Sequence, residues 1–171
     1  MVYKIVKLGH PVLEQVAGPV ENFGTPELQQ FVDDMFETMY AHKGVGLAAP
    51  QVNSARRLTV IDTSNGEDPA ARLVLINPEI VKLEGSQLGE EGCLSIPGFR
   101  EDVKRAMKAT VRARDVQGVE FETTGDELLA RAMQHEVDHL NGILFLQHLS
   151  ALKRDLIRRK IRKLQKAGEW D

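Results

Sequence analysis

The sequence predicts an α+β fold in which mainly antiparallel sheets pack around a central helix, followed by a helix at the C-terminus. Three observations predict it. Apolar residues recur at helical spacing near both ends of the chain, whereas short Val- and Ile-rich runs fill the middle. Helices and strands do not alternate regularly, which argues against a parallel sheet. The 171 residues contain no repeat and no Pro/Ser-rich linker, which favours a single domain over residues 1–171.

The first helix is expected from about Thr25 to His42. Its first residue is a suitable N-cap, and Pro26 suits the first helical position. Apolar residues from Leu28 to Tyr40 then form one stripe, so this helix packs on a core. Gly44 and Gly46 end it and open a glycine-rich stretch.

Three strands are expected next. Leu58–Asp62 and Leu73–Asn77 are short apolar runs separated by turn-forming residues. Pro78 then begins a separate strand over Glu79–Glu84.

The second half begins with a hairpin. Ala109–Arg114 and Val119–Thr123 alternate apolar and polar residues on either side of an Asp-Val-Gln-Gly turn. Helical spacing returns from Asp126, a suitable N-cap, to about Leu140. We expect a catalytic core over about residues 1–147 and a basic amphipathic helix over about residues 150–167.

Composition narrows the function classes. The net charge of -3 gives no basic field for DNA. Cys93 is the only cysteine, so no intramolecular disulfide is expected. We find no signal peptide and no apolar run long enough to span a membrane. A cytoplasmic location is the expectation, although an organellar form without its transit peptide would look the same.

His135-Glu136-Val137-Asp138-His139 is an HExxH motif on the predicted central helix. Histidines at i and i+4 project from one face, so both can bind one metal ion, and Glu136 can hydrogen-bond a bound water. A polar patch on an amphipathic helix is the alternative. The neighbouring positions are largely apolar, so burying these groups without a ligand would be costly.

Downstream residues offer poor choices for a third ligand. Phe145 stands where one metalloprotease class has a third histidine, and no glutamate occurs between His139 and Glu169. His148 and Asp155 stay as candidates on sequence grounds.

Upstream, the Cys93 thiolate is a strong ligand for iron(II) or zinc. A lone cysteine is more commonly an inert buried thiol. Two acids and a glycine before it, Glu90-Glu91-Gly92, argue against a plain core position.

Three ordered motifs give the chain a close resemblance to the peptide deformylase family. They are Gly44–Gln51 (GVGLAAPQ), Glu91–Ser95 (EGCLS) and Gln134–His139 (QHEVDH). Similar segments flank them, Leu75–Pro78 (LINP) and Leu140–Phe145 (LNGILF), so the resemblance covers most of the chain.

This resemblance implies removal of the N-formyl group from the N-terminal formylmethionine of nascent polypeptides, with release of formate. One metal ion, usually iron(II), would be held by Cys93, His135 and His139; zinc, nickel and cobalt also suit these ligands. A metal-bound water would attack the formyl carbon, with Glu136 as general base and acid. The Gln51 amide and the Leu94 backbone N–H would stabilise the oxyanion.

Substrate contacts are expected on both sides of the metal. Gly44 and Gly46 leave backbone groups free, which would let an extended peptide add as a strand. Candidate walls of a methionine pocket are Val45, Leu128, Arg131 and Ala132. The methylene stem of Arg131 could cover the methionine while its guanidinium reaches solvent; alternatively, Arg131 is simply exposed.

The final helix is strongly basic. Lys153 to Lys166 contains eight Lys/Arg and one acid, Asp155. The apolar positions predicted to dock it are Leu149, Leu152, Leu156, Ile161 and Leu164. Its basic face is either simply solvated or, as in some deformylases, a contact for the ribosome. A monomer is the default.

Two other function classes compete with this interpretation. One is an HExxH metalloendopeptidase, which Phe145 disfavours. The other is a non-catalytic metal-binding module, which would need neither Glu136 nor Gln51.

Overall fold

The computed structural model describes residues 1–170 and contains three α-helices and seven strands within them. The helices are α1 (Pro26–Ala41), α2 (Glu127–Leu140) and α3 (Ala151–Lys166). The strands are β1 (Gly46–Ala48), β2 (Leu58–Ile61), β3 (Leu73–Glu84), β4 (Gln87–Gly92), β5 (Arg100–Arg105), β6 (Lys108–Arg114) and β7 (Glu120–Asp126). None of these helices is both long and apolar enough to span a lipid bilayer.

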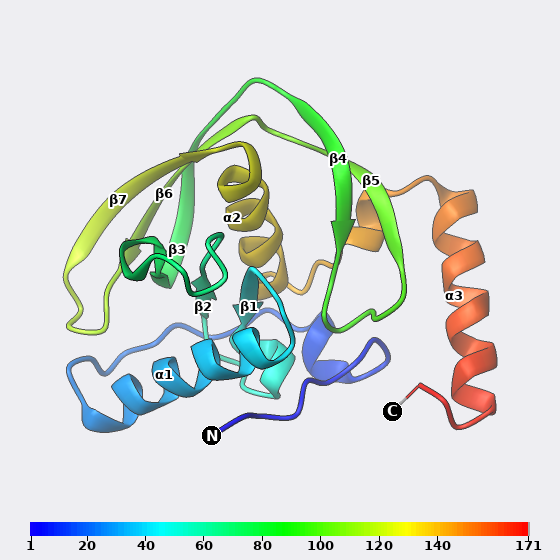
Figure 1. The fold of residues 1–171 in the computed structure, drawn as a ribbon, viewed down its shortest axis with the longest axis horizontal. Coiled ribbons are helices and arrows are strands. Elements are labelled where there is room, and N and C mark those ends of the chain that lie inside the picture. Colours follow the sequence, from blue (N-terminus) through cyan, green and yellow to red (C-terminus); the bar gives the residue numbers. More distant parts are fainter. Residues whose placement is uncertain (171) are drawn as a thin grey trace.

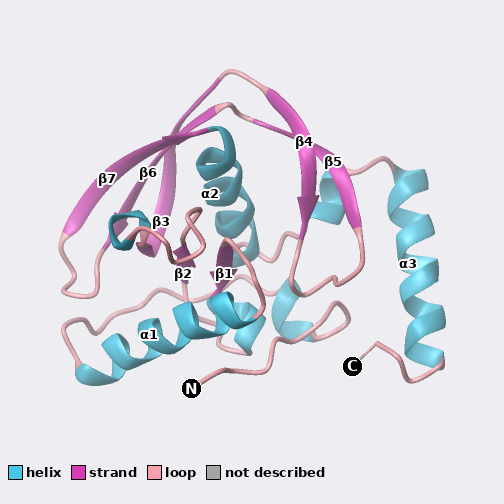
Figure 2. Cartoon of the chain, viewed as in Figure 1, coloured by secondary structure: helices cyan, strands magenta, loops and turns pink. Residues whose placement is uncertain are grey.

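Two antiparallel sheets surround α2, which confirms the predicted fold class. The larger has the order β1-β2-β3-β6-β7, and the smaller pairs β4 with β5. Figure 1 shows α2 between the two sheets, with α1 below and α3 at the far edge. Figure 2 shows the chain crossing above α2 twice, from β3 to β4 and from β5 to β6.

Helix α1 forms as predicted, with one difference at its end. The Thr25 side chain accepts a hydrogen bond from the Leu28 N–H, and Pro26 is the first helical residue. Gly44 donates its N–H to the Met39 carbonyl, so it helps close the helix. The left-handed residue there is Lys43, with φ of 58°, rather than a glycine. The apolar face of α1 packs against β1 and β2.

Pro78 does not separate two strands, contrary to the prediction. β3 continues through it, and the pairing of β3 with β6 shifts register between Ile76 and Glu79. Asn77 takes the left-handed conformation at φ 51°, and its side-chain amide bonds both the N–H and the carbonyl of Val20. An irregularity in the ladder accommodates the missing N–H of a proline within a strand.

The β4–β5 sheet was not predicted. Its strands, QLGEEG and REDVKR, lack the alternation of apolar residues that marks a half-buried strand. Two of their charged residues are nevertheless buried, Glu91 and Arg105. Arg105 donates hydrogen bonds to Glu91 across the sheet, so the two buried charges pair with each other. Pattern analysis missed these strands because it assigns charged residues to the surface.

Asp126 occupies the predicted N-cap position of α2, but its side chain makes no capping hydrogen bond. The first helical residue, Glu127, has φ of 51° and donates its N–H to the Met107 carbonyl. The β5–β6 turn therefore closes the start of α2.

Helix α3 lies where the sequence predicted it, and the Ser150 side chain caps it by accepting a hydrogen bond from the Lys153 N–H. The predicted apolar stripe is partly wrong. Leu152 and Leu156 are 71% and 46% exposed, whereas Ile157 and Ile161 are buried. These isoleucines join a cluster of apolar residues that also contains Leu149, Phe145 and Trp170.

Candidate metal centre

Three potential ligands converge from two distant segments of the chain. His135 and His139 lie one turn apart on α2, and Cys93 directly follows β4. Their ligand atoms all lie within 4.8 Å of one another. The His139 Nε2 atom is 3.3 Å from the Cys93 Sγ atom and 3.2 Å from the His135 Nε2 atom.

The protonation chemistry of this cluster fits a cation. Burial and the neighbouring His135 hold the pKa of His139 well below its usual value. Burial also opposes charge on His135, but hydrogen bonds to Cys93 and Glu91 outweigh it and raise the pKa of His135 well above its usual value. Both histidines are buried beside the Cys93 thiol, so three lone-pair donors face one another away from solvent. A divalent cation would satisfy all three donors at once.

Glu91 orients the first histidine. Its Oε1 atom lies 2.7 Å from His135 Nδ1. An ionised carboxylate only accepts, so the imidazole donates from Nδ1 and directs Nε2 toward the cluster. Burial opposes ionisation of Glu91, but hydrogen bonds from Arg105 and His135 outweigh it and hold its pKa well below the usual range. Glu91 is therefore a carboxylate that fixes the ring of a candidate ligand.

Buried arginines balance this carboxylate. Arg105 donates from Nε and Nη2 to the two oxygens of Glu91, at 2.9 and 2.8 Å. Its Nη1 donates to Asp138 at 2.7 Å, and Asp138 in turn lies 2.8 Å from His148 Nε2. The network connects the buried cluster to a histidine near the surface.

Neither downstream candidate for the third ligand joins the cluster. His148 contacts Asp138 and Arg105 instead, and Asp155 is an exposed residue of α3. Phe145 is buried with its ring stacked 6.5 Å from that of His135. The structure thus brings Cys93 to the two histidines and leaves the downstream residues outside.

Glu136 is a buried carboxyl beside the cluster. Burial raises its pKa to about 7. Its Oε2 atom lies 3.4 Å from the Thr59 hydroxyl, and its Oε1 atom lies 4.0 Å from His135 Nε2. A carboxyl with a pKa near neutrality can both take and return a proton. A Cβ atom at Gly46 would lie only 2.7 Å from Glu136 Oε1, so a glycine there makes room for the carboxyl.

Hydrogen bonds hold the Gln51 side chain next to Cys93. Its Oε1 atom accepts from the Ala48 N–H at 2.9 Å. Its Nε2 atom donates to Ser95 Oγ at 3.1 Å and approaches Cys93 Sγ at 3.5 Å. Leu94 follows Cys93 directly, so both predicted oxyanion donors lie beside the thiol.

A cleft of about 660 Å³ opens onto these residues. Edge strand β1 lies on one side and strand β4 on the other, with α2 between. Every substrate-contact residue predicted from the sequence lines it, namely Gly44, Val45, Gly46, Leu128, Arg131 and Ala132. Leu128 is half exposed, whereas Ala132 is buried.

Both predictions for the Arg131 guanidinium were wrong. Arg131 is only 6% exposed. Its Nη1 atom donates to Glu91 at 2.6 Å and to the Val103 carbonyl at 2.8 Å. The guanidinium of Arg131 therefore contacts the buried carboxylate of Glu91 rather than solvent. A Cβ atom at Gly89 would lie 3.1 Å from Nη2, so this glycine leaves room for the arginine.

Sequence analysis missed the residues behind the ligands. Glu91 was noted only as a neighbour of Cys93, and Arg105 and Asp138 were given no role. The signal was available in part, because an acid two residues before a candidate ligand is a natural partner for a histidine. Nothing in the sequence placed Arg105 against it, since the pairing depends on the unpredicted β4–β5 sheet.

The α+β fold, the cleft and the Cys/His/His cluster beside a buried carboxyl are typical of a hydrolase with a site for one metal ion. Comparison with known proteins makes this more specific. The family model described as polypeptide deformylase matches residues 2–155, and the chain belongs to this family of enzymes.

The chain is also similar to individual peptide deformylases over most or all of its length. The chain is 59% identical to a peptide deformylase of Acidobacterium capsulatum over 170 residues, covering 99% of each protein. It is 51% identical to a peptide deformylase of Chromobacterium violaceum over 154 residues, covering 90% of each. A crystal structure of a peptide deformylase from Legionella pneumophila superposes with a TM-score of 0.91 at 46% identity, covering 100% of this chain and 99% of the other. These matches favour neither a metalloendopeptidase nor a non-catalytic module.

Proposed function

We propose that this enzyme removes the N-formyl group from the N-terminal formylmethionine of nascent polypeptides and releases formate. One observation carries the proposal: a thiol and two imidazoles converge beside a buried carboxyl at the base of a peptide-sized cleft. Family membership supports the same reaction. The enzyme acts as one deformylase domain over residues 1–171.

Cys93, His135 and His139 would hold one divalent metal ion. Iron(II) is our first choice, and zinc, nickel and cobalt suit the same ligands. When bound, the ion supplies Lewis-acid chemistry: it lowers the pKa of a coordinated water and polarises a carbonyl oxygen. Three protein ligands suit a catalytic site, because a further position stays open.

Glu136 moves the proton in this mechanism. Its carboxylate accepts a proton from the attacking water and returns it to the leaving amine of methionine. A pKa of about 7 supports both steps at neutral pH. Glu136 is only 3% exposed, so bulk water has little access to the carboxyl.

Gln51 and Leu94 stabilise the charge that develops on the formyl oxygen. The Gln51 amide is held by Ala48 and Ser95, so its N–H groups need little reorganisation during the reaction. The Leu94 backbone N–H supplies a second donor.

The substrate chain binds between the two sheets. β1 is an edge strand of its sheet, so an extended peptide would add alongside it, and the glycines of the first motif leave the approach open. Ala132, Leu128 and Val45 provide apolar walls for methionine. The stem of Arg131 completes this wall while Glu91 neutralises its charge.

The direct test is formate release from formyl-Met-Ala-Ser by protein purified without oxygen. We expect rapid deformylation and no cleavage of a peptide whose only susceptible bond is internal. Internal cleavage without formate release would contradict the proposal.

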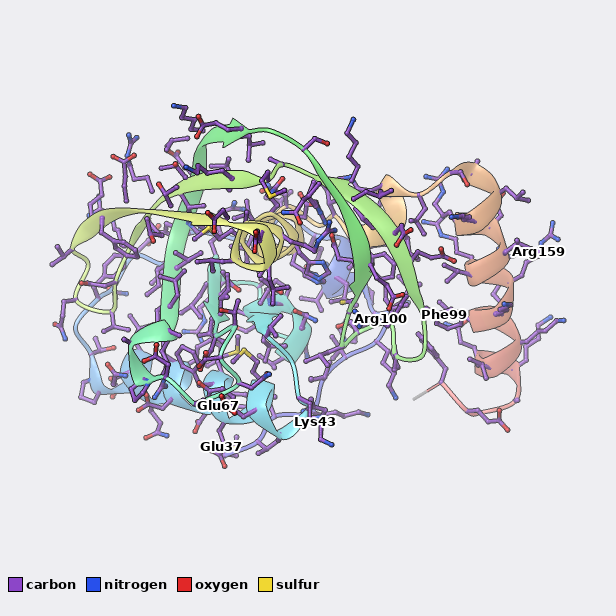
Figure 3. All side chains as sticks on the ribbon, turned by 45° about the horizontal axis from the view of Figure 1, so that its top comes forward. Glu37, Lys43, Glu67, Phe99, Arg100 and Arg159 are labelled. Carbon is purple, nitrogen blue, oxygen red and sulfur yellow. The ribbon has the colours of Figure 1, made fainter. Side chains whose placement is uncertain are left out.

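Helix α3 supports a second element of the proposal, a docking contact with the ribosome in the cytoplasm. Six of its eight Lys/Arg side chains are exposed, and within residues 1–170 only Lys153 has an acidic partner. Figure 3 shows Arg159 projecting away from the body of the protein. The enzyme would dock as a monomer.

Sedimentation with ribosomes at low salt tests this contact. Reversing Arg159, Lys160 and Lys163 to glutamate should weaken binding strongly, since contacts with phosphates depend on charge. Unchanged binding would remove the docking element and leave the deformylase proposal intact.

A further inference from the structure

Trp170, the only tryptophan of the chain, is buried although it lies four residues beyond α3. Trp170 is only 4% exposed. Gly168 turns the chain with φ of 71°, and the Glu169 N–H donates to the Leu164 carbonyl at 2.8 Å. Figure 1 shows this last segment returning from the end of α3 toward the N-terminal segment.

The indole makes two specific contacts. Its ring meets the Phe99 ring edge to face, with centroids 6.2 Å apart and an interplanar angle of 64°. Its Nε1–H donates to the Leu8 carbonyl at 2.8 Å. Phe99 lies in the loop between β4 and β5, where Figure 3 labels it. It also lines the cleft.

The segment that contains Leu8 is hydrogen-bonded to residues at the candidate site. The Leu8 N–H donates to the Ser95 carbonyl at 2.9 Å, and the Val6 N–H donates to the Gln51 carbonyl at 2.8 Å. Ser95 also accepts from the Gln51 side chain. One indole therefore contacts both the cleft wall and the strand-like segment that supports the proposed oxyanion donors.

We propose that Trp170 is a positioning residue that fixes the substrate cleft through Phe99 and Leu8. It touches no reacting atom. Its effect falls on substrate binding, because Phe99 lines the cleft, whereas the hydrogen bond from the Leu8 N–H to Ser95 does not involve the indole. The family match ends at residue 155, so this contact belongs to a part of the chain outside the shared model. The inference rests on the proposed deformylation, which supplies its assay.

Kinetics of Trp170→Ala provide the first test. We expect KM for formyl-Met-Ala-Ser to rise about threefold to tenfold with kcat within about twofold, as loss of an aromatic contact to a binding wall predicts. Trp170→Phe keeps a ring against Phe99 and should recover most of the loss. Glu169→Ala is the matched control, because its side chain is exposed on the same segment.

A double variant separates positioning from a general structural effect. If Trp170 acts through Phe99, adding Trp170→Ala to Phe99→Ala should raise KM less than the two single changes combined. A KM for Trp170→Ala equal to that of Glu169→Ala would overturn the proposal. Full additivity with Phe99→Ala would also overturn it.

Fluorescence gives a test that needs neither a stable Trp170 variant nor turnover. Trp170 is the sole indole emitter, so Glu136→Gln enzyme can be titrated with formyl-Met-Ala-Ser without consuming the peptide. We expect a saturable change in emission and weaker quenching by acrylamide. Saturation of the cleft without any change would contradict the inference. Absence of formate release by the unaltered enzyme would instead reject the proposed function.

Discussion

Helices α2 and α3 have similar lengths and many charged residues, but they place those charges in opposite environments. Ten of the 14 residues of α2 are buried, against two of the 16 in α3. The charges of α2 meet partners from β4 and β5, as in the contact of Arg131 with Glu91. Those of α3 mostly face solvent. A buried, paired charge can fix a reactive group, whereas an exposed charge is free to meet another molecule.

The largest effect should come from Glu136→Gln on α2. The amide keeps the shape but cannot take a proton, so kcat/KM for formyl-Met-Ala-Ser should fall about 10²- to 10⁴-fold. Glu127→Gln, an exposed change on the same helix, should leave the rate unaltered. Formate release measures both, with metal content as a check. Full activity of Glu136→Gln would reject the proton-transfer role.

Glu91→Ala should lower the free energy of unfolding by about 3–5 kcal/mol, because it leaves Arg105 and Arg131 buried without their carboxylate. Glu90→Ala is the matched control, since Glu90 pairs with Arg100 at the surface. Denaturant unfolding gives the comparison. Equal stability of the two variants would mean that the buried network contributes no more than a surface pair.

Gly46→Ala should lower the free energy of unfolding by about 1–3 kcal/mol and reduce the rate of formate release, because its added Cβ atom would lie 2.7 Å from the Glu136 carboxyl. Gly18→Ala is the control, since the nearest atom to its added Cβ would be 3.8 Å away. Thermal unfolding and formate release measure the two effects. If Gly46→Ala matches Gly18→Ala in both, the space beside α2 is less constrained than the contact distance indicates.

The smallest effect should come from Arg159→Ala on α3. Its side chain is exposed, so stability should change by no more than about 0.5 kcal/mol and kcat/KM should not change. Arg131→Ala on α2 should be far more destabilising, since it leaves Glu91 short of a partner. If urea unfolding shows that both arginine substitutions lower the free energy of unfolding by a similar amount, the proposed difference between the two helices is wrong.

Sequence periodicity predicted the regular elements well where apolar residues define one face. Helix α1 and the β6–β7 hairpin are such cases. It failed where charges are buried in pairs, as in β4 and β5, because pattern analysis assigns charged residues to the surface. It also separated β3 at Pro78, since the local rule for proline carried no information about the bulge that accommodates it.

Some residues of the candidate site could likewise be predicted from the sequence, and others could not. Motif spacing placed His135, His139 and Glu136 on one helix, and the chemistry of a thiol suggested Cys93. The supporting contacts of Glu91 with Arg105 and Arg131 depend on how separate segments meet in space, which short motifs do not encode. The packing of Trp170 on Phe99 joins residues from separate segments for the same reason.

Cobalt(II) substitution tests the central claim most directly. Metal-free protein should bind one cobalt ion per chain and show a thiolate-to-cobalt charge-transfer absorption. Cys93→Ala should abolish that band and bind the ion much more weakly, because only two imidazoles remain. A cobalt complex that lacks the band, or equally tight binding by Cys93→Ala, would contradict a centre built from this thiol and the two histidines of α2.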